Sequence, residues 1–208
     1  MPVITRMSSE ERRAAILHAA VGLFAERGFR GTTTRALADA VGVTEPVLYE
    51  HFKSKHELYA AIIEAKSREG MARATAALEP LVRAKDDRAV FTGVGEVILQ
   101  TYHHDRDYAR LLLSVALEDP QLGQLFYDRQ REGRELLAGY IEERIRDGAF
   151  RPVDSRVAAR AFIGMLAHHG VQAVLYNDDF VKASSRHIVE QMVDLFLFGI
   201  SKTSRRQK

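Results

Sequence analysis

The first quarter of the chain gathers hydroxyl, aromatic and basic side chains that are suited to an anionic partner. Tyr49 carries a phenol that can donate a hydrogen bond to a phosphate oxygen. Thr33 and Thr34 stand where a helix is expected to begin, and the free amides of a helix N-terminus favour anions. Lys53 and Lys55 add positive charge shortly afterwards. These side chains predict contacts with the phosphate backbone of a nucleic acid.

The surrounding residues predict two short helices, 34–41 and 44–52, joined by a tight turn. Gly42 can adopt the positive φ that such a turn requires. Thr44 can cap the second helix, and Pro46 is tolerated in a first helical turn. A helix presented in this way can enter the major groove of duplex DNA with its N-terminal residues at the base edges.

This segment resembles the helix-turn-helix of the tetracycline-repressor (TetR/AcrR) family over about residues 9–65. The resemblance rests on Phe24-Ala25 followed by Gly28, Thr-Thr-Arg-x-Leu-Ala, Gly-Val, Pro-x-Leu-Tyr-x-His and Lys55-His56-Glu57-Leu58. It implies an all-α fold of about nine helices. An N-terminal three-helix DNA-binding domain would be followed by a helical domain for ligand binding and dimerisation.

The resemblance implies groove or backbone contacts, a base-reading face and phosphate contacts among these residues. Together with the residues singled out above, the candidate DNA-binding set is Thr33, Thr34, Arg35, Thr44, Glu45, Pro46, Tyr49, His51, Lys53 and Lys55. Glu45 departs from the family, where an uncharged or small side chain is more usual. Its carboxylate can accept a hydrogen bond from cytosine or lie close to phosphates, and the sequence leaves both open. Arg35 can equally be a solvated cation, and His51 can simply fill the turn.

Apolar residues recur at helical spacing along the whole chain, and no stretch alternates as a strand does. Ser8 and Glu11 have the spacing of a capping box, Gly28 is placed to end that first helix, and Ser54 can cap a long one. Further helices are expected at 86–103, 106–117, 121–147, 154–176 and 183–200. The predicted domains are 8–55 for DNA binding, continuing to about residue 65, then 56–200 for ligand binding and dimerisation, and a basic tail at 201–208.

Charge is distributed unevenly behind a net value of +2. Residues 1–55 hold eight basic and six acidic side chains, residues 56–200 hold 18 and 22, and the tail holds four basic ones. A basic segment at residues 1–55 followed by an acidic segment at residues 56–200 is expected of a protein that contacts nucleic acid at one end. Random scatter of surface charge would produce it as well.

Several function classes lack their signatures. The chain has no cysteine, no Gly-rich phosphate loop, no His-Glu-x-x-His and no Gly-x-Ser-x-Gly, so we expect no enzyme activity, cofactor or metal site. His103 and His104 are adjacent, so on a helix they cannot chelate as an i, i+4 pair can. A second doublet, His168-His169, lies in an apolar helix, and the sequence does not exclude a functional role for it. Without a membrane-length apolar run or a signal-peptide pattern, a cytoplasmic protein is expected.

The resemblance further implies a homodimer in which the last two helices of each subunit form a four-helix interface. Small residues in helix 154–176 allow another helix to approach, and helix 183–200 carries more apolar surface than one internal face needs. The candidate interface residues are Gly164, Ala167, Val171, Val174, Ile188, Met192, Leu195 and Phe196. Packing of all these residues within one subunit is the alternative.

A ligand pocket in the C-terminal half is also implied, and its filling would release the DNA. The candidate lining is Phe91, Ile98, Tyr102, Leu113, Leu117, Phe126, Tyr127, Phe162, Met165 and His169, although most of these residues can equally be plain core. His169 shares a helical face with Phe162 and Met165, so its imidazole needs a polar partner. That partner can be the Tyr102 hydroxyl or a group of the ligand. Such a pocket suits a largely hydrophobic, aromatic molecule.

Together these inferences predict a DNA-binding transcriptional regulator, expected to be a repressor. It would bind a palindromic operator on double-stranded DNA as a homodimer and be released by a small-molecule effector, with no membrane partner. An all-α small-molecule-binding protein or enzyme without specific DNA binding is the alternative.

Overall fold

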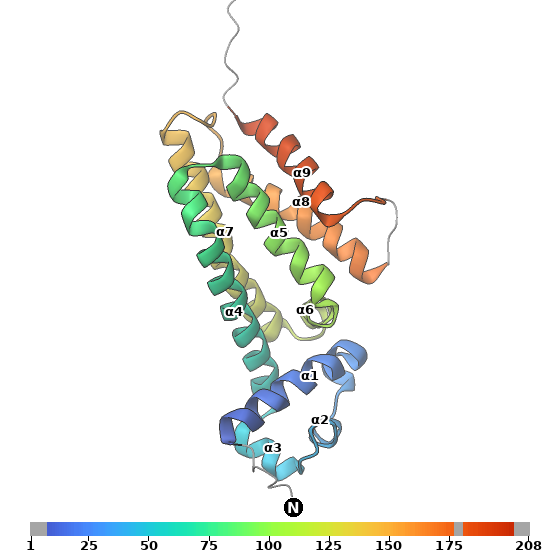
Figure 1. The fold of residues 1–208 in the computed structure, drawn as a ribbon. Helices are drawn as coiled ribbons and strands as arrows, with labels where there is room; N and C mark the ends of the chain where they lie inside the picture. The colour runs from blue at the N-terminus through green and yellow to red at the C-terminus, as the bar shows by residue number, and fades with distance from the viewer. Residues whose placement is uncertain (1–7, 177–180, 202–208) are drawn as a thin grey trace, which may run out of the picture. The chain divides into compact units, whose positions relative to one another are not determined.

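The computed structural model describes residues 8–176 and 181–201, and this part of the chain is almost entirely helical (Figure 1). Its helices are α1 (Ser9–Gly31), α2 (Thr34–Val41), α3 (Glu45–His51), α4 (Lys55–Ala84), α5 (Asp87–His104), α6 (Arg106–Glu118), α7 (Pro120–Arg146), α8 (Ser155–Leu175) and α9 (Ser185–Ile200). The predicted all-α fold of about nine helices is confirmed. Within the described ranges the only strand-like pairing is an isolated bridge between Phe150 and Ser201.

Local capping signals explain why the predicted helix ends, apart from the end of α1, lie within two residues of their observed positions. The Ser8 hydroxyl accepts a hydrogen bond from the Glu11 amide at 3.2 Å, and the Ser8 amide donates to the Glu11 carboxylate at 2.7 Å. This is the reciprocal capping box expected from the sequence. Gly28, expected to end α1, has φ +71° and interrupts the helical geometry, but the helix continues to Gly31.

The chain divides into two compact units, and the first is larger than the predicted DNA-binding domain. It contains the described residues up to Ser67 together with Asp107–Tyr127, so α6 and the start of α7 belong to it. The buried Tyr59 hydroxyl donates to the Leu111 carbonyl at 2.5 Å, and its ring packs 4.7 Å from that of Phe24. These contacts explain why the unit extends beyond residue 55: the start of α4 and α6 share one core.

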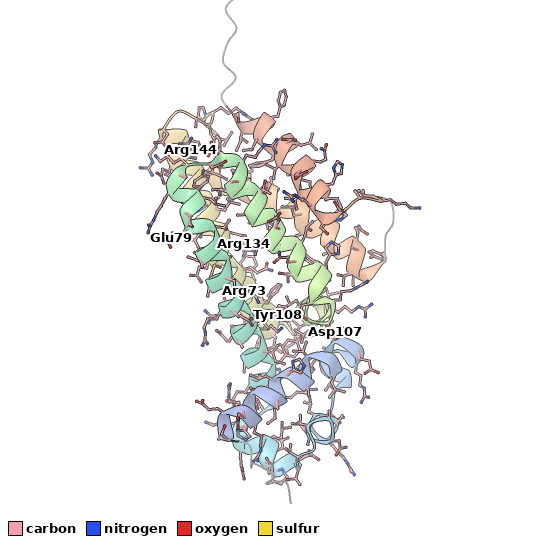
Figure 2. All side chains as sticks on the ribbon, in the orientation of Figure 1. Arg73, Glu79, Asp107, Tyr108, Arg134 and Arg144 are labelled. Carbon is pink, nitrogen blue, oxygen red and sulfur yellow. The ribbon has the colours of Figure 1, made fainter. Side chains whose placement is uncertain are left out.

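The second unit contains Arg68–Arg106 and the described residues from Asp128 onward. Here α5 packs against α8 and α9. Its centre holds the rings of Phe91, Phe162 and Phe196, whose centroids lie 4.9 to 5.1 Å apart. On the exposed surface of α4, Arg73 pairs with Glu69 and Arg83 pairs with Glu79, as expected of i, i+4 neighbours. Figure 2 labels Arg73 and Glu79 among the side chains of this helix.

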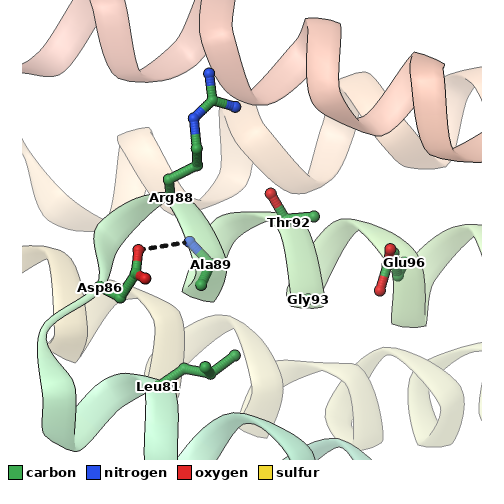
Figure 3. Close-up of a pocket in the computed structure, with 7 residues that line it drawn as sticks. All are labelled: Leu81, Asp86, Arg88, Ala89, Thr92, Gly93 and Glu96. Carbon is green, nitrogen blue, oxygen red and sulfur yellow. Dashed lines mark hydrogen bonds between the residues drawn. The ribbon is translucent and has the colours of Figure 1, made fainter.

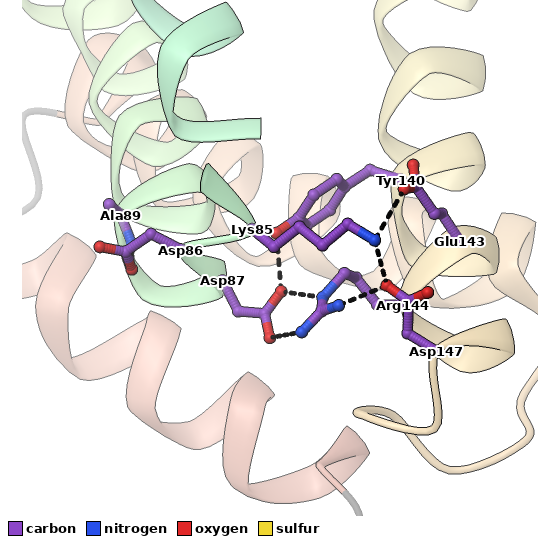
Figure 4. Close-up of polar contacts among 8 residues, drawn as sticks. All are labelled: Lys85, Asp86, Asp87, Ala89, Tyr140, Glu143, Arg144 and Asp147. Atoms are coloured by element: carbon purple, nitrogen blue, oxygen red, sulfur yellow. Dashed lines mark hydrogen bonds and ion pairs between the residues drawn. The ribbon is translucent and has the colours of Figure 1, made fainter. Parts of the chain in front are cut away.

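A polar network joins the turn between α4 and α5 to the end of α7 (Figure 4). The Arg144 guanidinium donates to both oxygens of Asp87, at 2.7 and 3.2 Å, and to Asp147 at 2.5 Å. Lys85 donates to the same Asp147 carboxylate at 2.7 Å, and the Tyr140 hydroxyl donates to Asp87 at 2.6 Å. Because the Arg144 side chain is only 12% exposed, this network holds the helices together more effectively than surface pairs can.

Candidate nucleic-acid interface

The turn between α2 and α3 has the geometry that the sequence predicts. Gly42 lies in the left-handed region, with φ +72° and ψ 33°, and its amide closes the end of α2 on the Asp39 carbonyl at 3.1 Å. Leu37, Ala38 and Leu48 are buried beneath the two helices. Local backbone geometry and this small shared core therefore hold α3 at a fixed angle to α2.

The three threonines predicted at helix starts have three different roles. The Thr33 hydroxyl accepts from the Ala36 amide at 3.1 Å and so caps α2. Thr44 occupies the cap position of α3, but its side chain makes no capping hydrogen bond, contrary to the expectation. The Thr34 hydroxyl donates to the Glu45 carboxylate at 2.8 Å, which joins the first residue of α2 to the first residue of α3.

Other predicted contact residues lie exposed around these helix starts. The side chains of Arg35, Pro46 and Lys53 are exposed, and Tyr49 is 45% exposed although it is a large aromatic residue. Among the described residues, the side chains of Arg35 and Tyr49 have no hydrogen-bond or ion-pair partner. His51 is partly buried at the last position of α3. A guanidinium and a phenol left free beside a short exposed helix are groups that can bind phosphate or base edges.

Lys55, predicted to contact phosphate, has an internal role in the structure. Its ammonium donates to the carbonyls of Phe29 at 2.6 Å and Thr32 at 2.9 Å, and it lies 4.4 Å from the centre of the Phe29 ring. Burial lowers the pKa of this ammonium, while the negative charge of Glu118 acts in the opposite direction. Lys55 therefore fixes the segment that leads from α1 into α2.

Two acidic residues that the sequence did not single out, Glu118 and Asp119, fix the same region. The Arg30 amide donates to the Glu118 carboxylate at 3.0 Å, and the Arg30 guanidinium donates to the Glu118 carbonyl at 3.1 Å. Asp119 lies 2.7 Å from the His56 ring nitrogen and caps α7 by accepting from the Leu122 amide. That amide and the His56 contact hold the pKa of Asp119 below its usual value. No local signal predicts the contacts with Arg30 and His56, because the paired residues lie 88 and 63 positions apart.

The candidate ligand-lining residues are divided between the two units. Phe91, Ile98, Tyr102, Phe162, Met165 and His169 belong to the second unit, and Leu113, Leu117, Phe126 and Tyr127 belong to the first. Phe91 and Phe162 are fully buried in the aromatic core, whereas Leu117 is 90% exposed. Burial raises the pKa of the Tyr102 hydroxyl. Among the described contacts that hydroxyl does not pair with His169, whose ring lies 6.3 Å from that of His103.

An open pocket of about 310 Å³ lies elsewhere in the second unit (Figure 3). Its lining is Leu81, Asp86, Arg88, Ala89, Thr92, Gly93 and Glu96, and none of these was predicted. Asp86 already accepts from the Ala89 amide, and Arg88 pairs with Asp194, so two of its charged groups are engaged. Among the described residues, no group of three acidic or histidine side chains is arranged to hold a metal ion. No helix in residues 8–176 and 181–201 is long and apolar enough to cross a membrane.

The candidate dimer residues fall into three groups, of which one, Ala167, Val171 and Met192, is partly buried. Val174, Ile188 and Phe196 are buried within the core of their own unit. Gly164 and Leu195 are exposed, and Leu195 is 71% exposed. Phe198, one turn after Leu195, is 87% exposed. Helix α9 therefore has one apolar side inside the subunit and another on its surface.

Comparisons with known proteins match both parts of the chain. A model of the bacterial regulatory proteins of the tetR family matches residues 16–62, and a model of the C-terminal domain of AefR-like transcriptional repressors matches residues 89–199. The transcriptional repressor KstR2 of Rhodococcus jostii is 30% identical over 158 residues, covering 72% of this chain and 73% of that protein.

Two solved structures show the same fold. That of the ketosteroid transcriptional regulator KstR2 of Mycobacterium tuberculosis has a TM-score of 0.64 at 25% identity and covers 97% of this chain and all of its own. The transcriptional regulator FadR of Bacillus subtilis, in complex with stearoyl-CoA, has a TM-score of 0.77 at 19% identity and covers 90% of this chain and 98% of its own. Over both units the similar proteins are regulators of transcription rather than enzymes.

Proposed function

The chain belongs to the TetR family of bacterial regulatory proteins and is a transcriptional regulator, and from that premise we propose that it is a homodimeric repressor of a palindromic operator. A small, largely hydrophobic effector would release it from the DNA. One observation carries the DNA-binding part: α3 is exposed at its start, with the unpaired side chains of Arg35 and Tyr49 beside it.

In this proposal α3 enters the major groove and the surrounding side chains hold the phosphates. Tyr49 and Lys53 contact phosphate oxygens, and Arg35 contacts either a phosphate or a base edge. Lys55 takes no part in it, because its ammonium already donates to two backbone carbonyls. Thr33 contributes through the α2 N-terminus, since its hydroxyl is used in capping.

A single α3 of seven residues offers too little surface for tight specific binding by one subunit. A two-fold dimer overcomes this limit by placing two such helices in successive major grooves, roughly 34–36 Å apart or a multiple of that distance. The operator is then a palindrome, because the symmetry of the site mirrors that of the protein.

The exposed apolar surfaces of α8 and α9 support dimerisation. Leu195 and Phe198 on α9 are 71% and 87% exposed, and Val157 and Leu175 on α8 are also exposed. Burying one such side chain is worth about 1.5–3 kcal/mol, so a second copy of the same surface is a favourable partner. Gly164, exposed on α8 between these residues, lets the partner helix approach closely.

For the effector we retain the candidate residues of the second unit that are not fully buried: Ile98, Tyr102, Met165 and His169. The Tyr102 hydroxyl and the His169 ring supply polar anchors among apolar groups, which suits a hydrophobic ligand with a few polar atoms. The similar FadR binds stearoyl-CoA, and the similar KstR2 is a ketosteroid regulator. These two ligand classes, a fatty acyl thioester and a steroid, are therefore the first to test.

The test is a binding titration with a labelled duplex taken from the DNA flanking the protein's own gene, with a scrambled duplex as competitor. We expect the flanking duplex to be preferred and the complex to dissociate when stearoyl-CoA or a ketosteroid is added. Equal affinity for both duplexes would refute DNA-specific function and favour a small-molecule-binding protein instead. His169→Ala, compared with the wild type, then tests whether His169 contacts the active compound.

A further inference from the structure

The contact between Thr34 and Glu45 is the one part of the candidate interface that the proposed function does not explain. Both residues are partly buried, and each is the first residue of its helix. The Thr34 hydroxyl donates to one carboxylate oxygen, Oε2, at 2.8 Å. A hydrogen bond to an ionised carboxylate is stronger than a neutral one, so it restricts the rotamers of the long Glu45 side chain.

This contact leaves the other carboxylate oxygen available. Among the described residues no group donates a hydrogen bond to Oε1 of Glu45, and the neighbouring Thr44 and Pro46 are exposed. The hydroxyl proton of Thr34 is used by Glu45, so Thr34 cannot donate it to a phosphate. The pair therefore presents one oriented, negatively charged acceptor at the start of α3.

A negatively charged acceptor on a DNA-binding surface needs a donor, because repulsion from phosphates opposes binding. The major groove offers two base donors, the N4 amine of cytosine and the N6 amine of adenine. The adenine amine stands beside the N7 acceptor of its own base, which repels a carboxylate. Cytosine has no such acceptor on its major-groove edge. A carboxylate held at the start of the groove-entering helix therefore selects cytosine.

We propose that Glu45 is a specificity-determining residue that selects a cytosine at one position of each operator half-site, and that Thr34 is its positioning residue. The proposal rests on the proposed function, since it requires α3 to enter the major groove. The proposal assigns to Glu45 a preference for one base, which a purely structural contact between α2 and α3 would not give.

The experiment is selection from a randomised duplex library, followed by binding titrations with every single-base-pair variant of the selected site. It compares the wild type with Glu45→Gln, Thr34→Val, Thr34→Ser and Glu50→Gln. Glu50 is the matched control, because it is an exposed glutamate on the same helix and removing it takes away the same charge. Thermal melting of each variant shows that the helices remain folded.

We expect Glu45→Gln to exchange the preferred cytosine for adenine at one position, with a change in relative affinity of about tenfold, because glutamine pairs with adenine N6 and N7. Thr34→Val should weaken the preference for cytosine at that same position, whereas Thr34→Ser, which retains the hydroxyl, should keep it. Glu50→Gln should change the affinity for all duplexes by one common factor.

Three results would overturn the proposal. If Glu45→Gln keeps the wild-type ranking of base pairs at every position, Glu45 has only a structural role between α2 and α3. If Thr34→Val keeps the full preference for cytosine, Thr34 is not a positioning residue. If the wild type enriches no sequence from the library, the proposal fails, and only this third result also refutes the proposed function.

Discussion

Replacement of Lys55 by methionine separates an internal role from a phosphate contact. The variant keeps most of the apolar stem but loses two hydrogen bonds, from the ammonium to the carbonyls of Phe29 and Thr32. A hydrogen bond from a charged group contributes roughly 1.5–3 kcal/mol, and a cation over an aromatic ring adds about 0.5–1 kcal/mol. Because Lys55 is partly exposed, solvent replaces part of this loss. We expect the free energy of unfolding to fall by about 2 kcal/mol and Tm to fall by about 4–8 °C.

The assay has two measurements, thermal melting and the salt dependence of operator affinity. A lysine that contacts phosphate lowers the slope of log affinity against log salt by about 0.9 when it is removed. We expect Lys55→Met to melt earlier with an unchanged slope, and Lys53→Met to melt normally with a reduced slope. If Lys55→Met melts like the wild type and loses salt dependence, the internal assignment of this ammonium is wrong.

Four further changes test other parts of the structure. Tyr49→Phe should weaken binding to all duplexes alike, by about 1 kcal/mol, in a titration against specific and random DNA, because it removes a phosphate hydrogen bond; loss on one sequence only would contradict this. Phe198→Asp should convert the proposed dimer to monomers in sedimentation, and an unchanged mass would remove this surface from the proposed interface. Arg144→Met should lower the free energy of unfolding in urea by about 2 kcal/mol, because it leaves the partly buried carboxylate of Asp87 with the Tyr140 hydroxyl but without its ion-pair partner; an unchanged midpoint would show that the network is not stabilising. The pKa of Asp119 is lowered in the fold, so Asp119→Asn should be less stable than the wild type at neutral pH. The difference should begin to shrink near the ordinary aspartate pKa of about 3.9 and vanish only below the lowered pKa of the folded state; a difference that persists there would exclude the charge of Asp119 as its cause.

The sequence predicts the helices well because their signals are local. The capping box of Ser8 and Glu11 and the positive φ of Gly42 depend on residues within one or two turns, so spacing alone identifies them. The same locality explains the agreement of the helix boundaries with the structure.

The contacts that the sequence does not predict are those of side chains whose partners are distant along the chain. Lys55 lies beside a DNA-binding motif and resembles a phosphate contact, but its two acceptors are 26 and 23 residues away. Only the tertiary fold brings them together. The link between Arg30 and Glu118 spans 88 residues and leaves no trace in local sequence.

The last helix shows a further limit of sequence patterns. Helix α9 is apolar on two sides, and hydrophobicity cannot indicate which side enters the core of its own subunit. The structure buries Ile188 and Phe196 and exposes Leu195 and Phe198. Only the packing of α5 and α8 against α9 shows which of its apolar residues remain on the surface of the subunit.

Footprinting of the full-length protein on its selected operator, with the stoichiometry measured in parallel, tests the central claim most directly. We expect two protected half-sites related by two-fold symmetry on one face of the DNA, roughly 34–36 Å apart or a multiple of that distance, and an even number of chains per operator. Protection of a single non-symmetric half-site at saturation, or equal protection of unrelated DNA, would contradict the account.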